Sequence, residues 1–382
     1  METHRSGPFT FRIGVDLEAL APLMDRVADA HERLRKVPVL PGVVNSLERE
    51  VLVSSVFGTN TIEGGTLTEE ETARVLDADI DPARVRDEKE RRVANIDAAY
   101  REAERRMKGR NLKLAPSHRI ALTEAFFLDQ HRLITEGLTH PDNVPGQYRD
   151  NPRDRLTRVG DADHGGVYTP PKCLDDIRTL MAAFLAWSAS QPVLVLPPVI
   201  RAPLIHYYFE RIHPFWDGNG RVGRVAEAAV MMGEGYQLSP FAMSNYYLGR
   251  LDEYFAVFRQ AEQAEKKHDP HPNTPFVSFF LNGLLATVNR LHDRMNELLG
   301  DVLLQNMVTQ MLHERKLNAR QFTILQNLPS EGMTQRELRD APWYQSLYLR
   351  FTDKTRDRDM GRLRELSLVS VDDRGRIACR RL

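Results

Sequence analysis

A short segment near the middle of the chain holds several groups that can act on phosphates. It runs from His213 to Arg224 and reads HPFWDGNGRVGR. A Gly-Asn-Gly turn that leads into a helix points backbone N–H groups and the positive end of the helix dipole at one place. Arg221 and Arg224 stand three residues apart at the start of that helix and add bidentate donors for phosphate oxygens. The segment therefore predicts an anion-binding site.

Two further side chains of this segment suit the chemistry of a nucleoside triphosphate. Asp217, directly before the turn, offers the hard carboxylate oxygen that holds Mg²⁺ together with substrate phosphates. Histidine side chains exchange protons near neutral pH, so His213 suits the removal of a proton from an attacking hydroxyl. Phe215 is apolar within a polar loop and is expected to anchor that loop in the core.

Three other interpretations of the segment are weaker. Residues Gly218 to Gly223 fit the dinucleotide-binding pattern, but that pattern requires a preceding strand, and a helical pattern precedes it here. His206, Glu210 and His213 fall on one helical face, yet the His-Glu-x-x-His spacing of zinc enzymes is absent. A plain helix-capping turn needs neither two glycines around an asparagine nor two arginines. Phosphate binding is therefore the preferred interpretation.

The whole segment resembles the motif of the Fic family, whose best-known activity is transfer of AMP from ATP to a protein hydroxyl. The pattern His-Pro-Phe-x-Asp-Gly-Asn-Gly-Arg-x-x-Arg is matched without a gap. The preceding helix, a Tyr-Thr-Pro-Pro segment and a downstream Asp-Glu-Tyr-Phe segment are also similar, so the resemblance covers about residues 112–300. It implies a helical core with a β-hairpin flap, Mg²⁺ as cofactor and ATP as co-substrate.

The resemblance also implies roles for single residues. His213 becomes the general base and Asp217 the Mg²⁺ ligand. The nucleotide-binding residues that it implies are Gly218, Asn219, Gly220, Arg221, Arg224 and Tyr254, the last as a contact to the adenine. The expected acceptor is a Ser, Thr or Tyr hydroxyl of a protein, which includes the chain itself.

A second, shorter match lies upstream. Thr59-Asn-Thr-Ile-Glu63-Gly64 is similar to the inhibitory motif of Fic proteins that carry an inhibitory helix before the core. Glu63 would place a negative charge at the negative end of a helix dipole, so it needs a cationic partner. The resemblance names Arg224, whose other task is to hold the γ-phosphate. A solvated glutamate at a frayed helix end is the alternative.

Helical patterns dominate the chain and position these residues. Apolar residues recur at spacings of three and four through residues 16–37, and Thr68 with Glu71 forms a capping box. The other helices are predicted over residues 45–62, 88–108, 117–137, 175–190, 198–212 and 222–232. Residues 145–171 are rich in Gly, Pro, Asp and Asn and predict a flap.

The C-terminal part is predicted to be a separate unit that resembles a winged helix. Helices are predicted over residues 318–328, from Thr334 and over 353–366, followed by a strand, turn and strand over 368–378. Residues 314–382 hold 15 Lys or Arg and 10 Asp or Glu, a net charge of +5. The basic third helix suits DNA phosphates or a protein contact. Acidic residues alternate with its arginines, so a solvated, salt-bridged face is preferred; they are Asp353, Asp357 and Asp359.

Composition limits the class of protein. In 382 residues, 52 Lys or Arg nearly cancel 53 Asp or Glu, which argues against a global field for nucleic acid or anionic membranes. Cys173 and Cys379 lack the spacing of zinc or redox motifs. No apolar stretch reaches the roughly 18 to 20 residues of a membrane span, and no secretory signal is recognisable. A cytoplasmic location is expected.

The sequence thus predicts a mainly helical protein in three regions. Residues 1–111 form a helical region with an inhibitory helix at about 45–64, residues 112–300 a Fic-type core, and residues 301–382 a winged-helix-like domain. The leading interpretation is a protein adenylyltransferase held inactive by Glu63 on Arg224. The alternative is a winged-helix DNA-binding regulator with a nucleotide-sensing core. A homo-oligomer and a DNA or protein contact through the C-terminal domain stay open.

Overall fold

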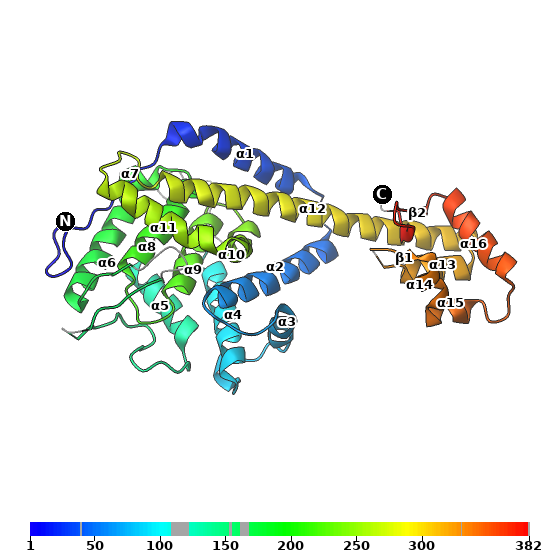
Figure 1. Cartoon of the computed structure of the whole chain (residues 1–382), viewed down its shortest axis with the longest axis horizontal. Coiled ribbons are helices and arrows are strands. Elements are labelled where there is room, and N and C mark those ends of the chain that lie inside the picture. Colours follow the sequence, from blue (N-terminus) through cyan, green and yellow to red (C-terminus); the bar gives the residue numbers. More distant parts are fainter. Residues whose placement is uncertain (39, 108–121, 153–154, 161–167, 330, 381–382) are drawn as a thin grey trace. The chain divides into compact units, whose positions relative to one another are not determined.

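The computed structural model describes residues 1–38, 40–107, 122–152, 155–160, 168–329 and 331–380. The chain divides into two compact units. The first holds Met1–Val37 and Asn45–His292, and the second holds Pro38–Val44 and Asp293–Leu382. Figure 1 shows that helices make up most of each unit. The fold is mainly helical, as the sequence predicts.

The first unit is built from helices and one short 3₁₀ turn. Their bounds are α1 Leu17–Lys36, α2 Pro41–Ile62, α3 Glu69–Asp77, η1 Pro82–Arg84, α4 Glu88–Met107, α5 Glu124–Thr135, α6 Leu174–Ser188, α7 Gln191–Leu194, α8 Pro198–Ile212, α9 Asn219–Met232, α10 Ser239–Gly249, α11 Leu251–Lys266 and α12 Thr274–His313. Helices α2 and α12 extend into residues of the second unit.

Helix α8 has the bounds that the sequence predicts, whereas two others begin earlier. Helix α2 begins at Pro41 instead of residue 45, because proline fits the first turn of a helix. Helix α9 begins at Asn219 instead of residue 222, because Gly218 caps it in the left-handed conformation, with φ 82°. This shift places the glycine turn inside the first helical turn.

Capping side chains start several helices. The predicted capping box of Thr68 and Glu71 is present at α3. Helix α5 begins after Thr123, whose hydroxyl accepts a hydrogen bond from the Phe126 N–H. The sequence predicts this helix from residue 117, but residues 117–121 lie outside the described part of the chain.

Helices α8 and α9 form the centre of the first unit. They pack against each other more extensively than any other pair of described elements, and α4, α5 and α10 also pack on α9. Most of their residues are buried, although Pro203 removes one N–H donor inside α8. The core therefore fixes where the chain leaves α8 and where it enters α9. The segment between them carries the predicted site.

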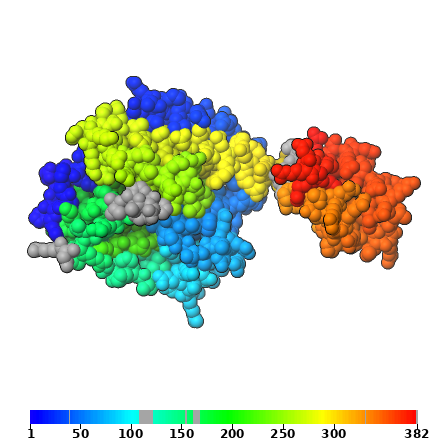
Figure 2. All heavy atoms as spheres, in the orientation of Figure 1, coloured from blue at the N-terminus to red at the C-terminus, as the bar shows by residue number. Residues whose placement is uncertain are grey.

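Helix α1 lies along α12 on one side of the first unit (Figures 1 and 2). The Asp16 N–H donates to Thr274 Oγ1 at 2.9 Å, next to the start of both helices. Further along, Arg33 Nη2 donates to Asn289 Oδ1 at 3.3 Å. These bonds fix the N-terminal helix on the unit that carries the site.

The predicted flap is described only in part. Val159 and Tyr168 form an isolated antiparallel bridge, with N–H to carbonyl distances of 2.9 and 2.8 Å. The Tyr168 hydroxyl donates to the Arg211 carbonyl at 2.8 Å. Residues 153–154 and 161–167 of the predicted flap lie outside the described residues. The bridge places the two stems of the segment side by side at the end of α8.

The second unit contains short helices and a small sheet. The elements after α12 are α13 Ala319–Asn327, β1 Met333–Thr334, α14 Gln335–Asp340, α15 Pro342–Leu347, α16 Asp353–Glu365, β2 Val369–Val371 and β3 Arg376–Cys379. The strands are antiparallel in the order β1-β3-β2. Capping boxes start α13 and α14. Helix α15 was not expected from the sequence.

One residue of α16 differs from its predicted role on a solvated face. Asp359 is buried. It accepts hydrogen bonds from Arg320 Nε at 2.8 Å, Asn318 Nδ2 at 2.9 Å and the Tyr348 hydroxyl at 3.0 Å. Asp359 therefore joins α16 to the start of α13, and only the other acidic residues of α16 remain to balance its exposed arginines. Among the described helices, none is both long and apolar enough to cross a membrane.

Candidate active site

His213 lies where helix α8 ends. Its backbone N–H donates to the Phe209 carbonyl at 2.9 Å. Its backbone is left-handed, with φ 48° and ψ 60°, which is uncommon for a residue other than glycine. Pro214 follows and lacks an N–H to continue the helix. The chain therefore turns sharply at His213, whose side chain is 15% exposed and lines a cavity.

Arg149 holds this turn from inside the protein. Its side chain is fully buried and donates to four acceptors: His213 O from Nε at 2.7 Å, Pro171 O from Nη2 at 2.7 Å, Thr157 Oγ1 from Nη1 at 3.2 Å, and Asn151 Oδ1 from Nη1. The Arg149 N–H also donates to the Pro214 carbonyl at 2.9 Å. Burial lowers the pKa of Arg149 to about 10, so the guanidinium is still charged at neutral pH. Arg149 thus connects the turn at His213 to both stems of the predicted flap.

We expect Arg149→Gln to lower the melting temperature by about 5 to 10 °C, because buried carbonyls at His213 and Pro171 each lose a donor. The matched control is Arg155→Gln. Arg155 is half-exposed and pairs with Asp142 at 2.7 Å, and such pairs contribute about 0 to 1 kcal/mol. Thermal unfolding of both variants measures the difference. Equal melting temperatures would contradict the role of Arg149.

Asn219 shapes the turn before α9. Its Nδ2 donates to the Phe215 carbonyl and its Oδ1 accepts from the Phe215 N–H, both at 2.9 Å. A Cβ at Gly218 would lie 3.1 Å from Thr135 Cγ2, so a side chain there would crowd α5. The first backbone N–H groups of a helix lack intrahelical acceptors, and Gly220 in this first turn lines the cavity. A positive helix end is therefore available to an anion.

His131 of α5 supports the same loop, which the sequence did not reveal. Its ring stacks on the fully buried Phe215, with centroids 3.7 Å apart. Its Nδ1 accepts from the Gly146 N–H at 2.9 Å, and its Nε2 lies 3.1 Å from the Asp217 carbonyl. Burial lowers the pKa of His131 to about 4, so the ring is neutral and Nε2 carries the proton. Phe215 anchors the loop, as expected.

Asp217 and Arg221 pair with each other. Arg221 Nη2 lies 2.7 Å from both carboxylate oxygens. Burial alone would raise the pKa of Asp217, but the charge and hydrogen bonds of Arg221 hold it below its ordinary value. Nε and Nη1 of Arg221 are buried, and no hydrogen-bond partner for them lies among the described residues. Buried donors of this kind are rare, and an additional acceptor such as a phosphate oxygen would satisfy them.

Glu63, at the end of α2, contacts Arg224. Arg224 Nη2 lies 2.7 Å from Glu63 Oε1, and its Nε donates to Thr59 Oγ1 at 3.3 Å. Burial alone would raise the pKa of Glu63, but the charges of Arg224 and Arg221 and the hydrogen bond from Arg224 together outweigh it and hold that pKa below its usual value. A Cβ at Gly220 would collide with Glu63 Oε1. The carboxylate therefore lies directly on the first turn of α9.

Two residues around this contact complete it. Gly64 follows Glu63 with φ 78°, and its N–H donates to the Thr61 carbonyl at 3.0 Å, which ends α2. Arg92 of α4, which the sequence analysis missed, donates from Nη2 to the Glu63 carbonyl at 2.6 Å. Burial is the main cause of a lowered pKa at Arg92. The negative end of α2 thus has two cationic partners, one on the carboxylate and one on the backbone.

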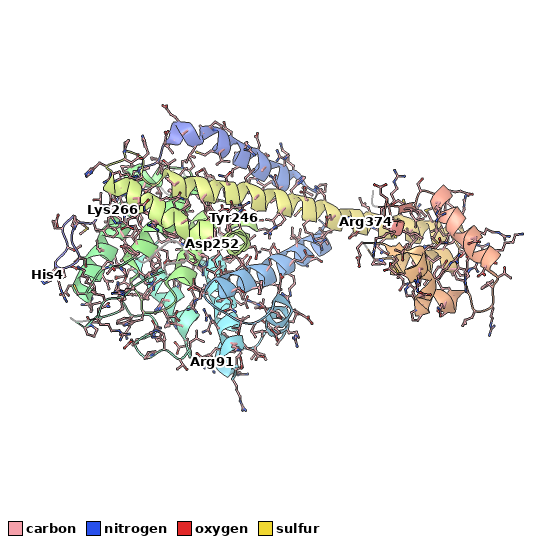
Figure 3. The ribbon with its side chains drawn as sticks, viewed as in Figure 1. His4, Arg91, Tyr246, Asp252, Lys266 and Arg374 are labelled. Atoms are coloured by element: carbon pink, nitrogen blue, oxygen red, sulfur yellow. The ribbon has the colours of Figure 1, made fainter. Side chains whose placement is uncertain are left out.

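These elements surround a cavity of about 480 Å³, a size typical of small-molecule sites. Helix ends supply Ile62 and Glu63 from α2, Glu210, Arg211 and His213 from α8, and Gly220 and Arg224 from α9. The flap stems supply Val159, Gly160 and Tyr168, and helix α11 supplies Tyr254, Phe255, Phe258, Arg259, Glu262, Gln263 and Lys266. Lys266, labelled in Figure 3, marks the α11 side of the cavity.

A buried hydrogen-bond network holds Tyr254 in the cavity wall. The Tyr254 hydroxyl lies 3.1 Å from His206 Nε2, and His206 Nδ1 lies 2.7 Å from Glu227 Oε2. The Tyr247 hydroxyl donates to Glu227 Oε1 at 2.8 Å. Both ring nitrogens of His206 are thus engaged inside the core. The ring of Tyr254 stacks on Tyr247, with centroids 4.7 Å apart, and the residue lines the cavity.

The structure therefore brings most of the predicted site residues together. His213, Gly220, Arg224, Tyr254 and Glu63 line one cavity. Asp217 and Arg221 pair beside it, and Thr59 contacts Arg224. The side chain of Asn219 and the backbones of Gly218 and Gly64 shape the turns without lining the cavity.

Residues 121–231 match the model of the Fic/DOC family. The protein adenylyltransferase Fic of Nematostella vectensis is 27% identical over 218 residues, which cover 56% of this chain and 45% of that protein. The protein of the same name from Culex quinquefasciatus is 25% identical over 238 residues, which cover 62% of this chain and 43% of the relative. The chain thus spans less than half the length of these curated relatives, and the homology is distant.

Solved structures agree on the fold. A Fic family protein from Desulfovibrio desulfuricans G20 superimposes with a TM-score of 0.56 at 19% identity, over 98% of each chain. Fic-1 from C. elegans (residues 134–508) superimposes with a TM-score of 0.52 at 20% identity, over 73% of this chain and 74% of that one. The chain has a mainly helical Fic fold with small C-terminal strands.

Proposed function

We propose that this distant relative of the protein adenylyltransferases transfers AMP from Mg²⁺-bound ATP to a Ser, Thr or Tyr hydroxyl of a protein. One observation carries the proposal: His213, Gly220 and Arg224 line a single cavity at the N-terminus of α9. A proton acceptor, a positive helix end and a guanidinium are the groups that nucleotidyl transfer to a hydroxyl requires.

Each residue then has a defined task. The hydroxyl oxygen of the acceptor attacks the α-phosphorus, His213 takes the hydroxyl proton, and the bond from the α-phosphorus to the β-bridging oxygen breaks to release pyrophosphate. The N–H groups at the start of α9 and the side chains of Arg221 and Arg224 bind phosphate oxygens. Tyr254 contacts the adenine. The geometry of His213 and the helix end supports this assignment.

Asp217 fits the expected Mg²⁺. A single carboxylate that shares the metal with substrate phosphates is the usual protein ligand of Mg²⁺ in nucleotide sites. The Asp217 carboxylate stays ionised, since Arg221 lowers its pKa, and it is half-exposed. When bound, Mg²⁺ neutralises charge on the phosphates. Arg221 would then share Asp217 with the metal.

We also propose that Glu63 inhibits this activity. In the contact described above, Glu63 occupies both Arg224 and the surface of Gly220, where a phosphate would otherwise bind. A nucleotide could enter only with its γ-phosphate displaced, and the α-phosphate would lose alignment with the hydroxyl that His213 activates.

Asp217→Ala should reduce transfer and raise the Mg²⁺ concentration needed for half-maximal rate by about tenfold or more, because the metal loses its protein ligand. A Mg²⁺ titration of the transfer rate measures this. Asp77→Ala, which removes a mostly exposed partner of Arg49, serves as the control. An unchanged Mg²⁺ requirement in Asp217→Ala would remove the residue from metal binding.

The function is tested with ATP labelled at the α- or the γ-phosphate. Label from the α-phosphate on protein supports nucleotidyl transfer, and label from the γ-phosphate alone means phosphoryl transfer.

The second unit is relevant to the alternative function, that of a DNA-binding regulator. We propose that it is winged-helix-like, which its strand order β1-β3-β2 and the exposed Lys354, Arg358 and Arg364 of α16 support. Tight duplex binding without any protein labelling would favour a nucleotide-sensing DNA-binding regulator.

A further inference from the structure

A carboxylate lies beside His213, and no arginine or lysine in the described part of the chain forms an ion pair with it. Glu210 stands three residues before His213 in the last turn of α8, and its Oε2 lies 3.4 Å from His213 Nδ1. Among the described residues, the neighbouring cations pair elsewhere: Arg211 with Glu265 and Arg224 with Glu63. The left-handed backbone of His213 turns its ring back toward α8. Among the ion pairs of the described residues, His213 is therefore the one partner of Glu210, and it is charged only when its ring is protonated.

Both groups have unused hydrogen-bonding capacity. His213 Nδ1 and Glu210 Oε1 are buried, and neither has a hydrogen-bond partner in the described residues. The Nδ1 to Oε2 distance is slightly long for a hydrogen bond, as is common in catalytic pairs without bound substrate. Of the two ring nitrogens of His213, it is Nδ1 that faces Glu210 inside the protein, while the side chain lines the cavity.

Stability does not explain the position of Glu210, because a carboxylate there is unfavourable. It places a negative charge in the last turn of a helix, at the negative end of the dipole, and its side chain is only 12% exposed. Helix α9 makes room for it: a Cβ at Gly223 would lie 2.7 Å from Glu210 Oε1 and 2.9 Å from His206 Cδ2. The absence of a side chain at Gly223 thus lets the carboxylate lie under the first turn of α9.

We propose that Glu210 is the positioning residue of His213. Its carboxylate accepts the Nδ1–H, which fixes the tautomer in which Nε2 carries no proton and can accept one. In the transfer reaction, the acceptor hydroxyl gives its proton to Nε2, and the imidazolium that forms lies next to the Glu210 carboxylate. A carboxylate that orients a histidine and balances its charge in this way is a recurring arrangement in acyl transfer. The inference rests on the proposed function and assigns a residue outside the matched motif.

The tautomer of His213 tests the inference without any activity. With ¹⁵N-labelled histidine in the full chain, the His213 signals are identified as those lost in His213→Ala. At a pH where the ring is neutral, we expect Nδ1 to be protonated in the wild type, and Nε2 to become protonated in Glu210→Leu. The control Glu90→Leu changes an exposed glutamate on α4 and should leave the signals unchanged. A wild-type ring protonated at Nε2, or the same tautomer in wild type and Glu210→Leu, would overturn the inference.

The kinetic test uses the Glu63→Gly background. Glu210→Leu should lower kcat about 10²-fold while KM for ATP changes by less than threefold, because the phosphates are held elsewhere. Glu210→Gln keeps an acceptor of the same volume without the charge, so kcat should fall only about tenfold. If Glu210→Leu does not fold, the test uses Glu210→Gln instead. An unchanged kcat in Glu210→Gln would overturn the inference. If neither the wild type nor Glu63→Gly labels protein, the proposed function is wrong. The tautomer of His213 then still tests whether Glu210 positions its ring.

Discussion

Replacement of His213 by alanine will abolish AMP transfer to protein, with a loss of about 10² to 10⁴-fold, and will leave ATP binding within a few-fold of the parent. The reason is the separation of tasks in the cavity. In the proposed function, His213 contributes a proton acceptor, whereas the helix end at Gly220 and the guanidinium of Arg224 hold the phosphates. The rate is best measured in the Glu63→Gly background, where a large loss is visible, and ATP binding by calorimetry.

A histidine outside the site provides the control. His313 is exposed at the end of α12, and His313→Ala should label protein at the parent rate. If His213→Ala also retained the parent rate, His213 would not be the base. If it lost ATP binding to the same extent as transfer, His213 would serve binding and not proton transfer.

Replacement of Glu63 by glycine should raise labelling of a target protein, or of the chain itself, by at least about tenfold, equivalent to about 1.4 kcal/mol of barrier. The change releases Arg224, which is almost fully buried, from its carboxylate partner at 2.7 Å. It also clears the oxygen that lies against Gly220. Both groups then become available to the phosphates of ATP. The double variant with His213→Ala should be inactive again.

The chain offers a close control for Glu63→Gly. Glu136 follows the last residue of α5 as Glu63 follows that of α2, and each precedes a glycine with positive φ, 69° at Gly137 and 78° at Gly64. Glu136 is exposed, so Glu136→Gly changes the same local backbone without touching Arg224. Equal labelling by the two variants and the wild type, with ATP bound in all three, would refute inhibition by Glu63.

The parts of the site that local patterns encode were predictable. The bounds of α8 follow from Pro198 at its first turn and Pro214 just beyond its end, and the tight turn before α9 follows from Gly218 and Gly220 beside Arg221. A carboxylate at a helix C-terminus needs a cation, and the resemblance to the Fic family named Arg224 as the partner of Glu63. The first two inferences use residues close together in the sequence, whereas Glu63 and Arg224 are 161 positions apart.

The parts that depend on tertiary contacts were not predictable. Arg149 looks like an ordinary loop arginine until residues 157, 171 and 213 are brought around it. Arg92 and His131 each lie on a helix with several charged and polar residues. The sequence does not indicate which of those side chains faces the interior of the protein. The alternation of Asp359 with arginines predicts a surface charge, because such alternation along a helix does not reveal burial. Helix α15 is short and starts at a proline, so periodicity cannot detect it.

The bonds of Arg149 have a consequence for how this region opens. If either stem of the flap moved away, a buried charge would lose its acceptors at Thr157 or Pro171, while the same guanidinium still held the His213 carbonyl. Partial opening is therefore the most costly state, and the stems and the turn at His213 should separate from the core together. In hydrogen exchange they would form one cooperative unit, so that the free energy protecting the stems also protects the backbone of His213.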